Sequence, residues 1–304
     1  MKKRRMKMKN RALTLTMLVN MTSNYSESLG NIASVQKVVR NGKVYSIRSK
    51  ESLKNALMVQ SGMYDDLHTV TKNEDKSSGK SVVLQKLVDD HHTVANCRSL
   101  EGGYMNTMEG TKVRKSSIYV TDAISCDSFI NMSRFHTNLY LSNNYVKENK
   151  LKDNKSMMIY QYEYDKSLKV YSVTIDLEMI GKDDNFDLEA PQEEKAKRVH
   201  ALLEAIQTLS IVVKGNLDNA EPIFVVGGLS DRKTHYFENN IHVKNNQLVL
   251  TEDLLLKLQE GYRCGLAQAN ILDNEEDIKQ TLHALRIKDF FEQLKKDVDD
   301  YYTI

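Results

Sequence analysis

Residues 20–57 read NMTSNYSESLGNIASVQKVVRNGKVYSIRSKESLKNAL, and the rest of the chain can be interpreted outward from them. The stretch joins a polar loop, rich in Asn, Ser and Gly, to a strand-like segment at 44–47 and a helix whose first turn starts at Ser49. Loop donors and the unpaired amides of a helix N-terminus suit a phosphate group. A surface loop followed by an ordinary Ser N-cap explains the same residues and is the simpler local interpretation.

Charge is distributed unevenly along the 304 residues. The formal net charge is +2, yet residues 1–60 contain 13 Lys and Arg and only two acidic residues, which leaves 30 basic and 39 acidic residues for the remainder. This asymmetry predicts a local surface that binds a polyanion, with salt-sensitive affinity, on an otherwise acidic body. The 40% of hydrophobic residues suffice for one large domain or one domain with insertions.

The cysteines and the N-terminus indicate the cellular compartment. Cys97, Cys126 and Cys264 are far apart and form no CxxC pair, so we expect neither a disulfide framework nor a metal site. The basic start followed by an apolar run is compatible with a secretion signal. However, Thr14 and Thr16 alternate with apolar residues, which predicts a half-buried strand, and no small-residue cleavage site follows. We therefore expect a cytoplasmic protein without a signal peptide or membrane span.

Hydrophobic periodicity predicts the remaining elements. The region 64–115 has a loose pattern and reads as an insertion, with a short helix at 82–92. The helix near Pro191, with that residue at its first helical position, is the clearest one. Strands are predicted at 11–19, 43–47, 117–123, 168–177 and 222–228, a hairpin at 241–250, and further helices at 252–262, 275–285 and 288–301, the first two capped by Thr251 and Asn274.

The segment 127–158 is polar but contains regularly placed aromatic residues, among them Phe129, Phe135, Tyr140 and Tyr145. Predicted strands flank it on both sides, so we expect a long hairpin that projects from the sheet. Its aromatic side chains can pack into a small core of their own, which is the simpler interpretation. They can alternatively stack against nucleobases or wedge between them.

Standard catalytic motifs are absent: the sequence contains no GxxxxGK[ST], GxSxG, HExxH or GxGxxG. The acidic pairs at 65–66, 89–90 and 183–184 lie in polar stretches, where solvation explains them. His91 and His92 are adjacent and therefore point to different sides of a helix or strand, so they do not converge on one metal ion. The residues favour binding over catalysis, and we expect no cofactor or metal.

Five stretches, taken in succession, resemble the crRNA-binding backbone subunit of type I CRISPR Cascade complexes, in the DevR family associated with subtype I-B. They extend over about two thirds of the chain, in the family's order. They are LTLTMLVNMTSNY at 13–25, the segment 28–57 with its SxxSLKxAL core, GGYM at 102–105, VTDAIS at 120–125 and YSVTIDLEMIG at 171–181.

The resemblance implies an α+β fold: a modified RRM, or ferredoxin-like, palm with a helical finger insertion and a thumb hairpin. The palm would comprise 10–61, 117–126 and 159–304, the last including the C-terminal helices. The finger would be 62–116 and the thumb 127–158.

The resemblance also implies that the loop after the first strand and the start of the first helix hold the RNA backbone. Some family members have Lys or Arg nearer the loop tip, where this chain has Asn24 and Asn31. The implied contacts are Asn24, Ser26, Asn31, Arg48, Ser49, Lys50 and Lys54, supported by Lys37, Arg40 and Lys43. To these we add a second basic loop, with Arg232 and Lys233, and the thumb residues Phe129, Phe135 and Tyr140.

The implied function is a non-catalytic guide-RNA subunit that oligomerises along the spacer RNA and forms the backbone of a CRISPR interference complex in antiviral defence. Its expected partners are crRNA, the target DNA strand paired to the guide, copies of itself and other Cascade subunits. Phosphates and riboses would be held while base edges stay free for pairing, so binding should be independent of sequence.

Two other functions stay open. One is a metal-independent endoribonuclease of the same superfamily, with His91 or His92 as general acid or base. For cleavage of the target, Asp65 or Asp66 is the candidate. The other is a DNA-binding autoregulator, although the sequence shows no helix-turn-helix.

Overall fold

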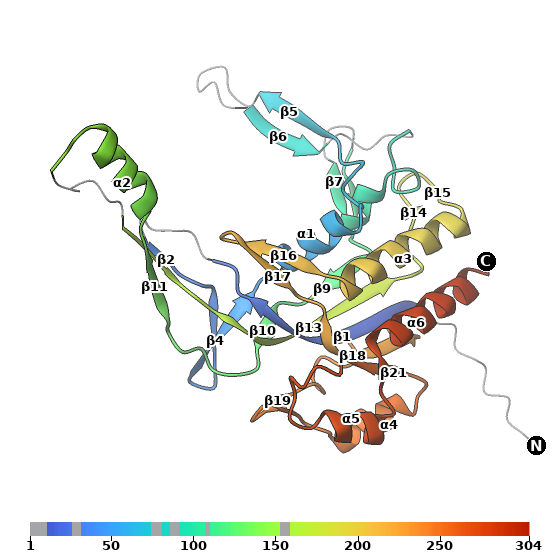
Figure 1. The fold of residues 1–304 in the computed structure, drawn as a ribbon. Helices are drawn as coiled ribbons and strands as arrows, with labels where there is room; N and C mark the ends of the chain where they lie inside the picture. The colour runs from blue at the N-terminus through green and yellow to red at the C-terminus, as the bar shows by residue number, and fades with distance from the viewer. Residues whose placement is uncertain are drawn as a thin grey trace, which may run out of the picture.

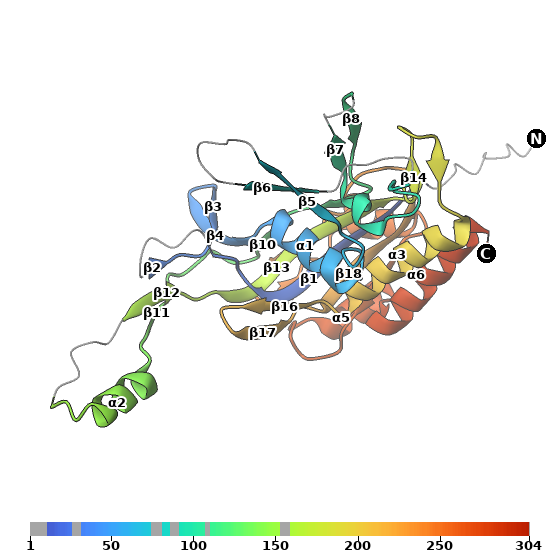
Figure 2. The same ribbon diagram turned by 90° about the horizontal axis from the view of Figure 1, so that it is seen from above.

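A computed structural model of the chain describes residues 11–25, 32–73, 81–85, 91–106, 110–152 and 159–303. In these residues the centre of the molecule is a nine-stranded sheet of order β22-β21-β18-β1-β13-β10-β4-β3, with β9 paired to β13 beside this path. Helices α1, α3 and α6 lie over one face of the sheet, and α4 and α5 lie at the other (Figures 1 and 2). The predicted α+β class is confirmed.

The middle of the sheet is formed by β1 (Ala12–Thr22) and β13 (Lys166–Asp176), which are antiparallel and in register over their full lengths. On its other side β1 pairs with β18 (Pro222–Ser230). These are the strands predicted at 11–19, 168–177 and 222–228. The prediction that β1 is half-buried is wrong: Thr14 and Thr16 are fully buried, because the segment after β18 covers the second face. There the Thr234 carbonyl accepts a hydrogen bond from the Thr14 hydroxyl.

Side-chain alternation along β1 separates two cores. Leu15 and Met17 face α1 (Lys50–Gln60), α3 (Gln192–Gln207) and α6 (Ile287–Tyr302). Leu18 faces the other core, which contains residues of α4 (Glu252–Leu258), α5 (Glu275–Leu282) and the hairpin of β19 (Val243–Lys244) and β20 (Gln247–Leu248).

The outer strands follow the predicted turns. The Asn41–Gly42 pair has positive φ at both residues, 49° and 73°, as a tight hairpin turn requires. The strand predicted at 117–123 is divided in two. The outer strands of the central sheet are β3 (Lys37–Arg40), β4 (Lys43–Arg48), β9 (Ile118–Val120), β10 (Ala123–Ser125), β21 (Arg263–Leu266) and β22 (Leu285–Arg286). Two separate hairpins are formed by β14 (Lys182–Asp183) with β15 (Leu188–Glu189) and by β16 (Ser210–Val213) with β17 (Asn216–Asn219).

The helix caps agree with the sequence in two cases and differ in two. The hydroxyls of Ser49 and Thr251 accept hydrogen bonds from the amides three residues onward, as predicted. Pro191 occupies the N-cap position instead of the first helical position. Asn274 is also at an N-cap, but its side chain bonds the backbone of Leu248 and so joins α5 to β20. None of the helices that the structure describes is long and apolar enough to cross a membrane.

The described parts of 62–116 do not form the helical insertion that we expected. They contain the hairpin of β5 (Thr69–Asn73) and β6 (Ser81–Gln85), one 3-10 turn at Arg98–Gly102, and the hairpin of β7 (Tyr104–Asn106) and β8 (Lys112–Arg114). The short helix predicted at 82–92 is replaced by β6 over its first residues, where adjacent valines favour a paired strand. Residues 86–90 lie outside the described residues.

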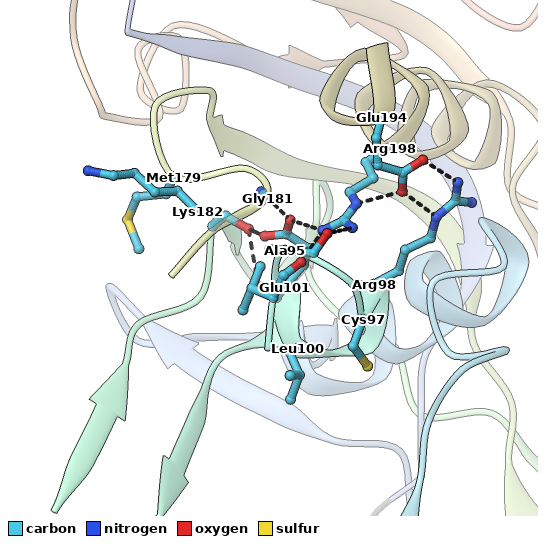
Figure 3. A network of polar contacts seen from close by, with 12 residues as sticks. Ala95, Cys97, Arg98, Leu100, Glu101, Met179, Gly181, Lys182, Glu194 and Arg198 are labelled. Carbon is cyan, nitrogen blue, oxygen red and sulfur yellow. Dashed lines mark hydrogen bonds and ion pairs between the residues drawn. The ribbon is translucent and has the colours of Figure 1, made fainter. Parts of the chain in front are cut away.

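A buried network of charges joins the base of this insertion to α3 (Figure 3). Glu101 is fully buried and pairs with Arg114 at 3.1 Å and with Arg198 at 3.0 Å. Arg198 also pairs with Glu194, which in turn pairs with Arg98 at 2.8 Å. Because a buried charge is tolerated only when it is paired, these residues fix the insertion to α3.

Candidate nucleic-acid interface

The end of β1, the start of α1 and the β3–β4 hairpin meet at Asn24. Its side-chain Oδ1 accepts a hydrogen bond from the Ser49 amide at 2.7 Å, and its carbonyl accepts one from the Gln36 amide at 2.9 Å. An isolated bridge between Tyr25 and Val35 closes the base of the loop. The structure therefore places the predicted loop and the predicted helix start side by side, with Asn24 as the connecting residue.

The amides at the start of α1 already have partners within the protein. The Ser49 amide is bonded to Asn24, the Lys50 amide donates to Asp122 Oδ1 at 2.7 Å, and the Ser52 amide donates to the Ser49 hydroxyl. The expected phosphate site on these amides is therefore replaced by internal contacts. The helix start still presents the Lys50 side chain, which is 60% exposed and lies 3.8 Å from the Glu51 carboxylate.

The predicted basic contacts differ in accessibility. Arg40 and Lys43 are exposed on the β3–β4 hairpin and form no ion pair with any residue that the structure describes. Lys37 is paired with Glu163 at 2.5 Å and lies over the Phe129 ring at 4.8 Å. Arg40, Lys43 and Lys50 are thus the available cations of this edge, which we call the cationic edge.

The predicted RNA contacts Lys54 and Arg48 are bonded inside the protein, with Arg48 buried and Lys54 half-buried. The Lys54 ammonium donates to Gly102 O at 3.1 Å and to Ser116 Oγ at 2.8 Å, and burial lowers its pKa. Arg48 is 2% exposed and donates to Thr22 O at 2.9 Å; burial lowers its pKa to about 10. Lys54 therefore fastens α1 to the insertion, and Arg48 fastens it to β1.

Two buried carboxylates hold the end of β1. Asp218, on β17, accepts hydrogen bonds from the Thr22 amide at 2.7 Å and the Thr22 hydroxyl at 2.6 Å. Burial acts to raise the pKa of Asp218, but the bonds from Thr22 and the charge of Lys166 outweigh it, so the pKa is lowered. Thr22 is thus bonded at its amide and hydroxyl by Asp218 and at its carbonyl by Arg48.

The second carboxylate is Asp165. It accepts hydrogen bonds from the hydroxyls of Ser23 and Ser46, each at 2.7 Å, and from the Lys169 ammonium at 2.6 Å. Lys169 is fully buried and also donates to Met21 O at 3.0 Å. Burial acts to raise the pKa of Asp165, but Lys169 and the hydroxyl donors lower it overall. Residues 21–23 are therefore fixed by charges from three distant segments.

Sequence reasoning missed these supporting residues. For Lys169 a signal was available, because it lies two residues before Tyr171 and four before Val173, on the face of β13 that points into the helix-side core. A lysine at such a position needs a buried partner. For Asp218, in a short polar hairpin, no local pattern distinguishes it from a solvated acid.

The projecting hairpin is present in the described residues, with a helix near its end (Figures 1 and 2). It comprises β11 (Ser133–His136), α2 (Leu139–Glu148) and β12 (Tyr160–Glu163), and we call it the arm. None of the residues of α2 is buried, and Phe135 and Tyr140 are 71% and 79% exposed. The interpretation that the aromatic residues form their own core is therefore wrong. Large apolar side chains also lie exposed at Ile130, Met132, Leu139, Leu141, Tyr145, Leu151 and Ile159.

The base of the arm is attached to the loop beside the cationic edge. Strand β2 (Ile32–Ala33) pairs in parallel with β12. Glu163 accepts a hydrogen bond from the Val35 amide at 2.9 Å, and the Tyr25 ring meets the Tyr162 ring edge-on at 6.0 Å. The described residues on both sides of the loop that follows β1 are therefore in contact with the arm.

The remaining predicted contacts lie elsewhere or outside the described residues. Ser26 and Asn31 belong to the residues that the structure does not describe. Arg232 and Lys233 follow β18 at the other end of the sheet, where Lys233 pairs with Asp176 at 2.8 Å. The eleven residues of β1 place its two ends roughly 33 Å apart. The second basic loop is therefore separate from the cationic edge.

The residues considered for catalysis have structural contacts. Asp66 accepts hydrogen bonds from the amides of Arg98 and Ser99, at 2.6 and 2.9 Å, and so caps the 3-10 turn. The ring of His92 lies edge-on to that of His68, at 5.5 Å. In the described ranges, no group of three or more His, Cys, Asp or Glu residues could hold a metal ion.

Comparison with known proteins relates this fold to CRISPR systems. The family model described as "CRISPR-associated negative auto-regulator DevR/Csa2" matches residues 13–247. A chain of a "CRISPR RNA-guided surveillance complex, pre-nicking" superimposes with a TM-score of 0.62 at 11% identity, covering 95% of this chain and 100% of that chain. A chain of a "CRISPR RNA-guided surveillance complex" gives 0.56 at 13% identity, with 96% and 98% covered. No curated protein matches the sequence.

Proposed function

The chain belongs to the CRISPR-associated DevR/Csa2 family, and we propose that it is a non-catalytic, guide-RNA-binding backbone subunit of a Cascade complex, of subtype I-B. Copies of the chain would line up along one crRNA and present its bases to a target DNA strand in the cytoplasm. The two similar solved chains come from RNA-guided surveillance complexes, which supports crRNA and other complex subunits as partners.

The observation that carries this proposal is the fixed end of β1 beside exposed cations. Residues 21–23 are held by Asp165, Lys169 and Asp218, so these three residues lose little conformational freedom when a ligand binds. Arg40, Lys43 and Lys50 present exposed positive charge next to it. Such an arrangement favours contacts with phosphates, which do not depend on sequence.

The arm supports the assembly part of the proposal. An apolar surface of this extent is unusual on a protein that works alone, because exposed apolar area favours association. Aromatic side chains such as Phe135 and Tyr140 can stack on nucleobases or pack against a neighbouring copy. Since the arm is bonded to the loop through β2, a copy that receives the arm would also lie beside the bound RNA.

Binding of the purified chain to single-stranded RNAs of increasing length tests the proposal. We expect the number of bound copies to increase in steps with RNA length, and the affinity to fall steeply with salt concentration. The same RNAs, recovered intact after incubation, would agree with a non-catalytic role. A chain that stays monomeric and does not bind RNA at low ionic strength would refute the proposal. Site-specific cleavage of the RNA that disappears in His91→Ala or His92→Ala would favour a nuclease.

A second candidate function rests on the family's description as a negative auto-regulator. An autoregulator would bind duplex DNA upstream of its own gene. Competition between single-stranded RNA and such a duplex separates the two candidates, because the guide-binding function predicts that excess duplex leaves RNA binding nearly unchanged.

A further inference from the structure

The second face of the sheet is only partly covered. Residues of the segment 231–248 lie over β1 and β18, where Thr14 is bonded to the Thr234 carbonyl. Over β13, β10 and β4 a cavity of about 430 Å³ remains. Ser172 and Ile124 line it from the sheet, Tyr45 and Arg40 from the β3–β4 region, and Glu238 from the covering segment. A volume of this size suits a small planar ligand.

Several polar groups of this cavity lack a hydrogen bond or ion pair within the part of the chain that the structure describes. The Arg40 guanidinium, the Tyr45 hydroxyl and the Glu238 carboxylate form no hydrogen bond or ion pair with any residue in the described ranges. Tyr45 is half-buried and lines the cavity, so its side chain is accessible to a stacked ligand there. The cavity thus combines an aromatic surface, an acceptor and a cation.

This combination fits a nucleotide with a hydrogen-bond donor on its base. An aromatic side chain on a sheet face can stack a base, and a carboxylate accepts from an exocyclic amino group. Uracil has a carbonyl oxygen where cytosine has the amino group, and this oxygen would face the negative charge of Glu238. The guanidinium of Arg40 would meet the phosphate.

The cavity is adjacent to the cationic edge. Asp122 lines the cavity and also accepts the hydrogen bond from the Lys50 amide at 2.7 Å. The backbone of Lys50 is therefore in direct contact with a residue that lines the cavity. A base from that strand could enter the cavity without leaving the cationic edge.

We propose that this cavity binds one amino-bearing nucleobase, stacked on Tyr45 and hydrogen-bonded to Glu238, with Arg40 on its phosphate. The ligand is either a base of the bound strand, in which case the inference rests on the proposed function, or a free mononucleotide. Each protomer would then prefer cytosine over uracil at one position, although its other contacts with RNA do not depend on the RNA sequence.

The test uses the full chain and measures binding of CMP, UMP and matched RNAs that carry C or U at every position. We expect the wild type to prefer the cytosine ligand by roughly fivefold or more. Tyr45→Ala and Glu238→Gln should each abolish this preference and leave the salt dependence of RNA binding unchanged. Tyr119→Ala is the matched control, because Tyr119 is an exposed tyrosine of the same sheet that does not line the cavity.

The outcomes separate the ligand sources. A preference for CMP over UMP identifies a mononucleotide site, and a preference seen only with RNA identifies a base of the bound strand; both support the proposal. Equal binding of cytosine and uracil ligands by the wild type, or a preference that survives both Tyr45→Ala and Glu238→Gln, overturns it. If the wild-type chain binds no RNA but still prefers CMP over UMP, the guide-binding function is refuted and the cavity assignment stands.

Discussion

The two ends of β1 use charge in different ways. At the end that leads to α1, Asp165, Lys169 and Asp218 form hydrogen bonds with the backbone and hydroxyls of residues 21–23. Lys50 stays exposed at this end. At the other end, surface charges pair with one another: Glu178 bonds Arg11 and Lys233.

This difference explains why a count of basic residues is an incomplete guide to a binding surface. Of the 13 basic residues in 1–60, six precede residue 11 and lie outside the described residues, and Arg11 belongs to the far end of β1. Arg48, Lys54 and Lys37 are bonded inside the protein or to the arm. A cation that the fold leaves exposed is more available to a polyanion than one bonded inside the protein.

The largest effect is expected from removing a buried carboxylate at the α1 end. Asp218→Ala leaves the Thr22 amide and hydroxyl without acceptors, so we expect a loss of stability of about 2–4 kcal/mol and a loss of RNA affinity of about 100-fold or more. Urea unfolding and RNA titration measure the two effects. Asp176→Ala is the matched control, because Asp176 is equally buried and pairs with Lys233 at the other end.

The control decides whether the two ends really differ. Asp176→Ala should lower stability by a similar amount but leave RNA affinity unchanged at a temperature where both variants are folded. If both variants lose RNA affinity in proportion to their stability, the α1 end has no special role and the comparison fails.

Acid should produce the same loss through protonation. The pKa values of Asp165 and Asp218 are lowered in the folded protein, so their contribution to stability is complete at neutral pH and disappears as the pH falls below about 3.9, the ordinary aspartate value. Circular dichroism between pH 7 and pH 2 would measure this loss. Asp165→Asn should show a shallower dependence on pH in that range; an identical profile would mean that other groups govern acid unfolding.

Removing the exposed cations should weaken binding without weakening the fold. Arg40→Ala, Lys43→Ala and Lys50→Ala together should reduce RNA affinity by roughly tenfold to 100-fold at low salt and flatten the slope of log K against log salt by about two. The thermal midpoint should change little, because these side chains are exposed. An unchanged slope would show that phosphates bind elsewhere on the chain.

A smaller effect is expected at the arm. Phe135→Ala and Tyr140→Ala remove side chains that are 71% and 79% exposed, so stability should change by less than about 0.5 kcal/mol. The number of copies bound to a long RNA should fall, while binding to an RNA that holds one copy should persist. Light scattering on the two RNAs tests this; equal losses on both would assign the arm to RNA contact alone.

The smallest effect is expected from the second basic loop. Arg232→Ala should change RNA affinity by less than about twofold, since one surface cation far from the bound strand adds little in the presence of salt. Filter binding at physiological salt would measure it. If Arg232→Ala reduces RNA affinity as much as the triple substitution of Arg40, Lys43 and Lys50, the RNA must contact both ends of β1. The two ends would then not differ in function.

The sequence alone determined the elements that depend on near neighbours. The alternation around Thr14 and Thr16 specifies a strand because successive side chains point to opposite faces, and Asn41–Gly42 specifies a tight turn because both residues tolerate positive φ. Ser49 starts α1 because its hydroxyl reaches an amide three residues away. The order of such stretches also indicated the family, which the match over residues 13–247 confirms.

Only the tertiary structure decided which charged groups are available. Arg48 and Lys50 are two residues apart and look equivalent in the sequence, yet one is 2% exposed and the other faces solvent. The partner that fixes Thr22 is Asp218, 196 residues away, and no local pattern encodes such a pairing. Burial and ion pairing depend on segments that meet only after folding. For that reason the place of the candidate site followed from the sequence, whereas the assignment of each residue in it followed from the fold.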